Sequence, residues 1–241
     1  MVAQVPAHTM TAKGRLFWIK PVTWFAVLAI LIDVMIVASA LAETQGQGIL
    51  LSQDGVAQCT IVVPQESSPK ELELASELAH WLKEMTGATF DVSRGLRDQA
   101  IILGTWDEWR TLLSADMEPP KGPEGYRIRS DRKNLWIIAR SELGLQHAIY
   151  DFLECLGCRW YFPDPVWTVI PRVPTLVIQL DRTAVPAFGY RRIWYGWGPR
   201  TDKLARDYQD WLKHNRQLGS FAVSCGHSYD SHIPPSQFAE H

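Results

Sequence analysis

The sequence predicts an α/β (α+β) domain in which two helices cover one face of a mixed β-sheet. Between residues 59 and 162, short β-branched runs alternate with two longer segments that have helical apolar periodicity. Both longer segments carry helix start and stop signals, and each has a single apolar stripe. Because one apolar stripe needs one apolar surface to cover it, both helices are expected on the same sheet face.

The first helix is expected to begin at Ser68. Ser at the cap, Pro69 in the first turn and Glu71 three residues on form an N-terminal signature. Gly87 is typical of a helix end. The apolar face between these signals consists of Leu74, Leu78, Trp81, Leu82 and Met85.

The second helix is expected to begin at Ser141 and to end at Gly157, with one apolar face that includes Phe152. Strands are expected around it and before it, and the stretch 166–180 is expected to be extended because prolines punctuate it. The expected strands are residues 59–63, a run at 90–92, 100–104, a hairpin of 126–129 with 135–139, and 159–162.

Composition excludes some classes of function. The 24 Lys+Arg and 26 Asp+Glu residues give a formal net charge of -2, so no basic surface for nucleic acid is expected. With 46% hydrophobic and 21% charged residues, the chain is too apolar to be disordered. Its 11 tryptophans either pack in the core or face sugar rings, whose flat apolar faces stack on aromatic rings.

The first 42 residues are expected to direct export. Basic residues precede an apolar run at 22–42 that closes with Ala40-Leu41-Ala42, the order found in secretory signal peptides. Cleavage is expected after Ala42. Asp33 inside the run and the length of the run leave open an uncleaved signal anchor. The protein is therefore predicted to be secreted or periplasmic, or membrane-anchored by residues 22–42.

Four cysteines follow this segment, at positions 59, 155, 158 and 225. The Cys155-x-x-Cys158 spacing occurs in redox and zinc sites, but only one such pair is present. Structural zinc sites need further ligands at set spacing. The alternative is that both cysteines pack as small apolar residues.

Three strings in the predicted domain resemble a known family. They are Gly125-Tyr126-Arg127-Ile128, the stretch ARSELGLQHAIYDFLE at 139–154 and Leu156-Gly157-Cys158-Arg159-Trp160-Tyr161-Phe162-Pro163. They resemble the N-terminal domain that precedes the catalytic barrel in α-glucuronidases of glycoside hydrolase family 67. They are closer to exported α-glucuronidase-like proteins with domain of unknown function 4838, and family 20 hexosaminidases have a similar leading domain. The resemblance implies a non-catalytic domain at 43–182 after the signal segment 1–42.

The same resemblance implies that residues 184–241 begin a (β/α)8 barrel. Residues 188–193 would form its first strand, 202–216 its first helix and 221–224 its second strand. Such a barrel needs about 250 residues, so at most two of its eight units fit here. The catalytic carboxylates of the family are expected further along than residue 241. No catalytic residue is therefore predicted, and this chain alone is expected to be inactive.

Four residues of the expected barrel are candidates for sugar binding. Arg191, or its neighbour Arg192, offers a fork for a uronic acid carboxylate, Trp194 and Trp197 offer a stacking wall, and His227 would lie at the barrel rim. Each has a structural alternative: a surface arginine, packing against the leading domain, and a histidine bonded to backbone. His227, Asp230 and His232 suggest a metal only weakly, because no helix or strand arranges them. No metal and no cofactor are predicted.

The predicted function is that of a non-catalytic N-terminal part of an exported glycoside hydrolase-like protein. Its expected partners are a polysaccharide, which could contain uronic acids, and the remainder of the catalytic barrel. A membrane partner is expected only through an uncleaved anchor. Two other functions stay open: a stand-alone carbohydrate-binding module that uses exposed Trp, and a redox or metal protein that uses Cys155 and Cys158.

Overall fold

The computed structural model describes residues 48–193 and 200–221, which belong to a compact unit formed by Gly46–His241. The predicted signal segment 1–42 lies outside the described residues. Within the part of the chain that the structure describes, no helix is long and apolar enough to cross a bilayer.

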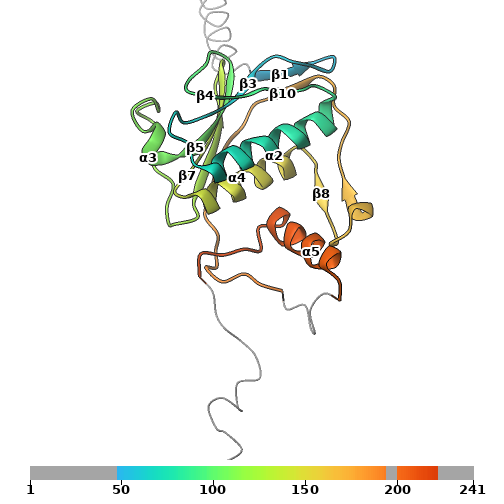
Figure 1. Cartoon of the computed structure of the whole chain (residues 1–241). Helices are drawn as coiled ribbons and strands as arrows, with labels where there is room; N and C mark the ends of the chain where they lie inside the picture. Colours follow the sequence, from blue (N-terminus) through green and yellow to red (C-terminus); the bar gives the residue numbers. More distant parts are fainter. Residues whose placement is uncertain (1–47, 194–199, 222–241) are drawn as a thin grey trace, which may run out of the picture. The chain divides into compact units, whose positions relative to one another are not determined.

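A six-stranded mixed sheet is the centre of the fold (Figure 1). Its strand order is β11-β6-β7-β5-β3-β4, with β4, β3, β5 and β7 parallel and β6 antiparallel to both of its neighbours. This confirms the predicted mixed sheet and four of the strands that the sequence indicated for it, while the strand predicted at 90–92 is displaced and runs over Val92–Arg94. The strands are β3 (Thr60–Val63), β4 (Val92–Arg94), β5 (Ala100–Thr105), β6 (Tyr126–Ser130), β7 (Asn134–Ala139) and β11 (Asp181–Ala184).

Two smaller sheets flank the main one. In the first, β1 (Ile49–Gln53) pairs with both β2 (Val56–Ala57) and β10 (Leu176–Ile178). In the second, β8 (Arg159–Trp160) pairs with β9 (Thr168–Val169). A short 3-10 helix, η1 (Pro165–Trp167), lies between these two strands in the chain. The stretch expected to be extended therefore supplies two short strands.

Two long helices, α2 (Pro69–Thr86) and α4 (Glu142–Cys155), lie side by side on one face of the sheet (Figure 1). The caps are those that the sequence indicates. The Ser68 hydroxyl accepts a hydrogen bond from the Glu71 backbone N–H (3.1 Å), and the Glu71 carboxylate accepts one from the Ser68 N–H (2.8 Å). Gly87 ends α2 with φ 78°, a conformation that favours glycine.

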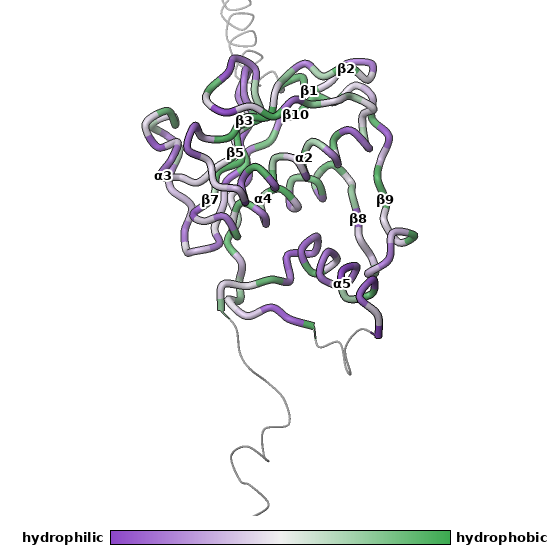
Figure 2. The backbone as a smooth tube through the Cα atoms, viewed as in Figure 1, coloured by the Kyte–Doolittle hydropathy of each residue, from purple (hydrophilic) through white to green (hydrophobic). Residues whose placement is uncertain are grey.

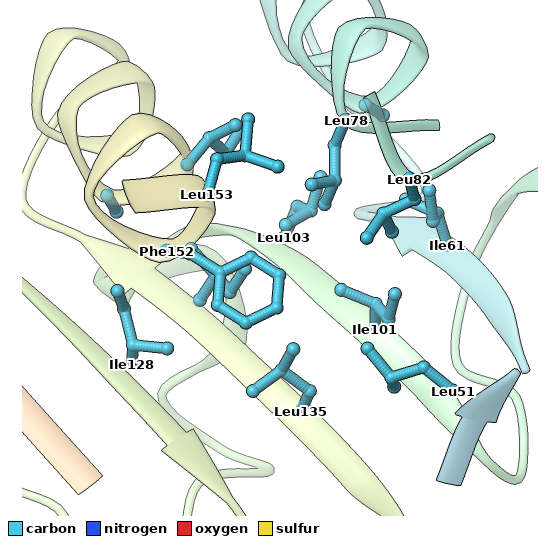
Figure 3. Close-up of a cluster of buried hydrophobic side chains, with 14 of the residues drawn as sticks. Leu51, Ile61, Leu78, Leu82, Ile101, Leu103, Ile128, Leu135, Phe152 and Leu153 are labelled. Carbon is cyan, nitrogen blue, oxygen red and sulfur yellow. The ribbon is translucent and has the colours of Figure 1, made fainter. Parts of the chain in front are cut away.

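The main core lies between these helices and the sheet. Figure 3 shows Phe152 pointing from α4 into the cluster among Ile101, Ile128 and Leu135, all of which are fully buried. The opposite sheet face is covered by a short helix, α3 (Trp106–Trp109), and the loop after it. Burial on both faces explains why β5 and β7 are continuous apolar runs rather than alternating ones.

The region after residue 180 differs in part from the expectation. The helix expected at 202–216 is α5 (Asp202–His214). The strand expected at 188–193 is wrong: these residues form no strand, and Phe188 is 73% exposed. A strand needs a neighbour, and the free edge of β6 is instead taken by β11. The strand expected at 221–224 lies outside the described residues except for Phe221, which is not in a strand.

Candidate functional site

Of the four predicted sugar-binding residues, only Arg191 belongs to the described part of the chain, and Trp194, Trp197 and His227 lie outside it. The Arg191 guanidinium donates to the Glu124 carboxylate and to the backbone oxygens of Leu218 (2.6 Å) and Arg216 (3.0 Å). The Glu124 side chain is only 4% exposed. Arg191 thus neutralises a carboxylate of the protein itself, and its role toward a substrate stays a prediction.

Glu124 is the centre of a buried polar cluster. Besides Arg191, it contacts His147 Nε2 (3.1 Å) and accepts a hydrogen bond from the Ser220 N–H (2.5 Å). Burial opposes its ionisation, but the hydrogen bonds from Ser220 and Arg191 outweigh burial and lower the pKa of Glu124. Burial and the Arg191 charge lower the pKa of His147 to about 4, so the imidazole is neutral at neutral pH. The cluster therefore joins segments that are far apart in sequence.

Polar contacts also attach α5 and the residues just after it to the two long helices. Lys213 pairs with Glu77 of α2, and Arg216 pairs with Glu154 of α4. Trp211 Nε1 and Asn215 Nδ2 each donate to the backbone oxygen of Trp160, both at 3.0 Å. We call the surface formed by Glu77, Glu124, Glu154 and Trp160 the docking face. It holds Arg191 and the stretch 211–220 by hydrogen bonds and ion pairs.

A groove lies between α2, the β8–β9 region and α5, with a volume of about 470 Å³. We call it the aromatic groove, after six lining rings: His80, Trp81, Trp160, Phe162, Trp211 and His214. Burial and the nearby Lys213 charge lower the pKa of His214 to about 3, so its ring is neutral. Four carboxylates complete the polar part of the lining: Glu84, Asp164, Asp207 and Asp210.

Three glutamates mark the helix N-termini at the carboxyl ends of the parallel strands: Glu71 in α2, Glu108 in α3 and Glu142 in α4. Burial, hydrogen bonding to Glu108 and the charges of Glu108 and Glu142 raise the pKa of Glu71 to about 7. Glu71 and Glu108 each bind a backbone N–H at the start of their own helix. Among the described residues, no group of three or more His, Cys, Asp or Glu side chains is arranged to hold a metal ion. Glu71 and Glu108 are therefore best understood as caps, and Glu142 as the acceptor for the Ser68 hydroxyl.

Part of this fold matches a known protein family. Residues 52–152, which run from β1 to α4, match the model of the Glycosyl hydrolase family 67 N-terminus. This domain is glycoside hydrolase-like. The match ends before Trp160, Arg191 and α5, so it covers the sheet and the long helices but only part of the docking face and of the aromatic groove.

Solved structures agree at the level of fold. The chain is similar to a family GH115 4-O-methyl-α-glucuronidase with specificity for decorated arabinogalactans. The two are 14% identical, the match covers 70% of this chain and 25% of that chain, and the TM-score is 0.54. A GH20 β-N-acetylhexosaminidase from Streptomyces coelicolor A3(2) has 24% identity, 61% and 25% coverage, and a TM-score of 0.41. Of the two TM-scores, only the 0.54 of the GH115 enzyme supports a shared fold. The chain spans about a quarter of the length of these enzymes.

No curated protein matches it. The closer resemblance to proteins with domain of unknown function 4838 stays a prediction.

Cys59, Cys155 and Cys158 form no disulfide with one another in the described part of the chain. Cys59 and Cys158 are buried and Cys155 is exposed. Burial raises the pKa of Cys158 to about 11 and also raises that of Cys155. Redox-active cysteines need a lowered pKa, so packing is the better interpretation of Cys158. Cys225 lies outside the described residues, as do Asp230 and His232.

Sequence reasoning missed most of the site. It treated Trp81 only as part of a helix face, Trp160 only as part of a strand and Glu124 not at all. The abundance of Trp was the one signal that pointed toward an aromatic surface.

Proposed function

We propose that this chain is the non-catalytic leading part of an exported glycoside hydrolase-like protein that acts on a polysaccharide. In this proposal residues 1–42 direct export, the glycoside hydrolase-like domain is a platform, and residues 184–241 begin the catalytic barrel. The domain match and the fold shared with a GH115 enzyme support it. The specificity of that enzyme for decorated arabinogalactans supports a substrate that carries uronic acid.

The observation that carries the proposal is the docking face. Three of its glutamates each hold a cation from the segment that follows: Glu124 holds Arg191, Glu77 holds Lys213 and Glu154 holds Arg216. Carboxylates that perform glycoside hydrolysis must face a substrate, one as acid and one as base or nucleophile. These three instead bind the protein's own cations. Their arrangement supports a role in fixing the following polypeptide on α2 and α4.

The docking role can be tested with Glu77→Gln. Glu77 accepts hydrogen bonds from Lys213 and from the Tyr150 hydroxyl (2.8 Å), so the variant weakens the hold on α5. A hydrogen bond to a charged group contributes about 1.5–3 kcal/mol, which predicts amide exchange in α5 faster by about tenfold or more. The amides of β5 should be unchanged. Glu73→Gln is the matched control, because Glu73 lies on the same helix and pairs only with nearby Lys70 at the surface. Equal α5 exchange in both variants would contradict the docking role.

The non-catalytic part of the proposal has a separate test. The purified chain is incubated with aryl α-glucuronides, aryl N-acetyl-β-glucosaminides and decorated arabinogalactan, beside a family 67 α-glucuronidase as positive control. We expect no release of product by this chain. Hydrolysis at enzymatic rates would overturn the proposal.

A further inference from the structure

Glu71 carries a buried carboxylate that the docking role does not use. The residue is only 1% exposed. One of its oxygens, Oε2, accepts a hydrogen bond from the Ser68 N–H (2.8 Å). The other, Oε1, is buried and has no donor in the part of the chain that the structure describes. Because a buried acceptor without a donor costs free energy, a proton bound at this oxygen is stabilising.

The groups around Glu71 are acidic. Glu108 from α3 lies within hydrogen-bonding reach of it, and the charge of Glu142 from α4 also acts on it. Lys70, the next residue in the chain, pairs instead with Glu73 at the surface (2.7 Å). Two carboxyl groups hydrogen-bond to each other only when one of them carries a proton. Burial and the acidic neighbours raise the pKa of Glu71 to about 7.

The contact between Glu71 and Glu108 joins two layers of the fold. The helix of Glu71, α2, packs on one face of the sheet, and α3 covers the opposite face. Glu108 holds the first turn of α3, because its carboxylate accepts hydrogen bonds from the backbone N–H and the hydroxyl of Thr105 (2.7 and 2.6 Å). The next residue, Trp109, belongs to the apolar cluster on that face. A change at Glu108 therefore acts on the cover of the second sheet face.

We propose that Glu71 and Glu108 share one proton and form a pH-sensitive clasp between α2 and α3. While the proton is bound, one carboxyl group donates to the other, and Oε1 of Glu71 is paired. When the proton leaves to solvent, two negative charges face each other, and α3 loosens from the sheet with the loop after it. The clasp is independent of the docking role, because no residue of the docking face takes part in it.

Hydrogen exchange of the full chain between pH 5 and 8 tests the clasp. The readout is the protection of the Leu112 and Leu113 amides, which donate to the Trp109 oxygen (2.8 and 3.2 Å), after correction for the intrinsic pH dependence of exchange. A raised pKa of Glu71 stabilises the closed form at low pH, and this stabilisation is lost as the pH rises through 7. Protection in the wild type should therefore fall by about tenfold or more from pH 5 to 8. Protection that does not change with pH would overturn the proposal.

Glu108→Gln replaces the shared proton by a permanent donor. The glutamine oxygen still accepts from the Thr105 N–H, and its amide N–H donates to Oε1 of Glu71 at every pH. Protection of the same two amides should then change by less than about twofold between pH 5 and 8. Asp107→Asn, at the exposed preceding residue of α3, is the matched control and should keep the full change of the wild type. Equal pH dependence in Glu108→Gln and in the wild type would contradict the clasp.

A second readout follows the proton itself. In a chain labelled with ¹³C at the glutamate carboxyl groups, the Glu71 signal reports the titration of Glu71, and the signal is identified by its loss in Glu71→Gln. In Glu108→Gln the protonated fraction of Glu71 at pH 7 should fall by about threefold or more, because a donor replaces an acidic neighbour. An unchanged titration would show that burial alone raises the pKa of Glu71, and would refute the shared proton whatever the exchange of α5 shows.

Discussion

The sheet core and the attachment of α5 are held by different forces. Between the long helices and the sheet, fully buried aliphatic and aromatic side chains make the contacts (Figure 3). At α5, which is mostly hydrophilic along its length (Figure 2), only Tyr208 and Leu212 are buried, and ion pairs and hydrogen bonds supply much of the contact. The first region is specified by non-directional burial, and the second by a few directional polar contacts.

The difference matters because the two kinds of contact fail differently. Burial is spread over many residues, so the core loses stability in proportion to the apolar volume that is removed. A buried ion pair contributes little beyond its desolvation cost, but removing one partner leaves an uncompensated charge. The comparison therefore predicts large losses from core truncation and intermediate losses at the docking face.

The largest effect is expected from Phe152→Ala. Phe152 is fully buried between α4 and the sheet, so truncation removes its burial and leaves a cavity. The free energy of unfolding should fall by about 3–5 kcal/mol, measured by urea denaturation. Phe221→Ala, at a residue 62% exposed, is the control and should change stability little. A loss below 1 kcal/mol for Phe152→Ala would mean that the core is less tightly packed than the structure shows.

An intermediate effect is expected from Glu124→Gln. The amide keeps an oxygen for the Ser220 N–H but no longer neutralises the half-buried Arg191 guanidinium. The expected loss is about 1.5–3 kcal/mol, the contribution of a hydrogen bond to a charged group, again from urea denaturation. Glu118→Gln, in the exposed loop before β6, should be neutral. Equal stability of the two variants would show that the Glu124–Arg191 ion pair does not stabilise the fold, and would favour a role of Arg191 in substrate binding.

The same contrast explains what the sequence could predict. The apolar stripes and caps of α2 and α4 are local patterns, and Ser68 and Glu71 are only three residues apart. The Glu124–Arg191 contact spans 67 residues, and nothing near either residue indicates the other. The aromatic groove likewise joins Trp81, Trp160 and Trp211 from three separate segments. Trp194 and Trp197, only three positions apart, suggested the sequence-based hypothesis, because a sequence shows which residues are close along the chain and not which are close in space.

The edge strand β11 shows a second limit. Asp181–Ala184 has three exposed residues and no alternating apolar pattern, so strand periodicity does not reveal it. Its position is set by pairing with β6 and by the ion pair between Arg127 and Asp181 (2.9 Å). Residues 188–193, which the sequence predicted as a strand, pair with no strand in the part of the chain that the structure describes.

A smaller effect, which depends on pH, is expected from Glu71→Gln. Glu71 has its pKa raised to about 7 in the folded state, against 4.5 as the ordinary value. Between these values the folded state holds a proton that the unfolded state has released, so this contribution is full below pH 4.5 and is lost as pH rises to 7. Glutamine cannot ionise and escapes this loss. The unfolding free energy of the variant minus that of the wild type should rise by more than about 1 kcal/mol from pH 5 to 7.5.

The two buried histidines act in the opposite direction, which is why the difference between the two proteins is measured. The pKa of His147 falls from 6.5 to about 4, so the unfolded state binds the proton first on acidification. Stability from His147 is full above pH 6.5 and is lost as pH falls to 4. This contribution is common to the wild type and to Glu71→Gln and cancels in the difference. Parallel stability curves for the two proteins would refute the raised pKa of Glu71.

The smallest effect is expected from Ser68→Ala, at the feature that the sequence predicted most directly. The Ser68 hydroxyl accepts from the Glu71 N–H and donates to the Glu142 carboxylate (2.5 Å), so it also joins the start of α2 to that of α4. Loss of an N-cap costs about 1 kcal/mol, measured by urea denaturation. Ser68→Asp keeps a cap acceptor for Glu71 but sets a carboxylate against Glu142. If the Ser68–Glu142 hydrogen bond stabilises the protein, Ser68→Asp will be less stable than the wild type, although Asp is as good an N-cap as Ser. Full restoration would show that Ser68 acts on α2 alone.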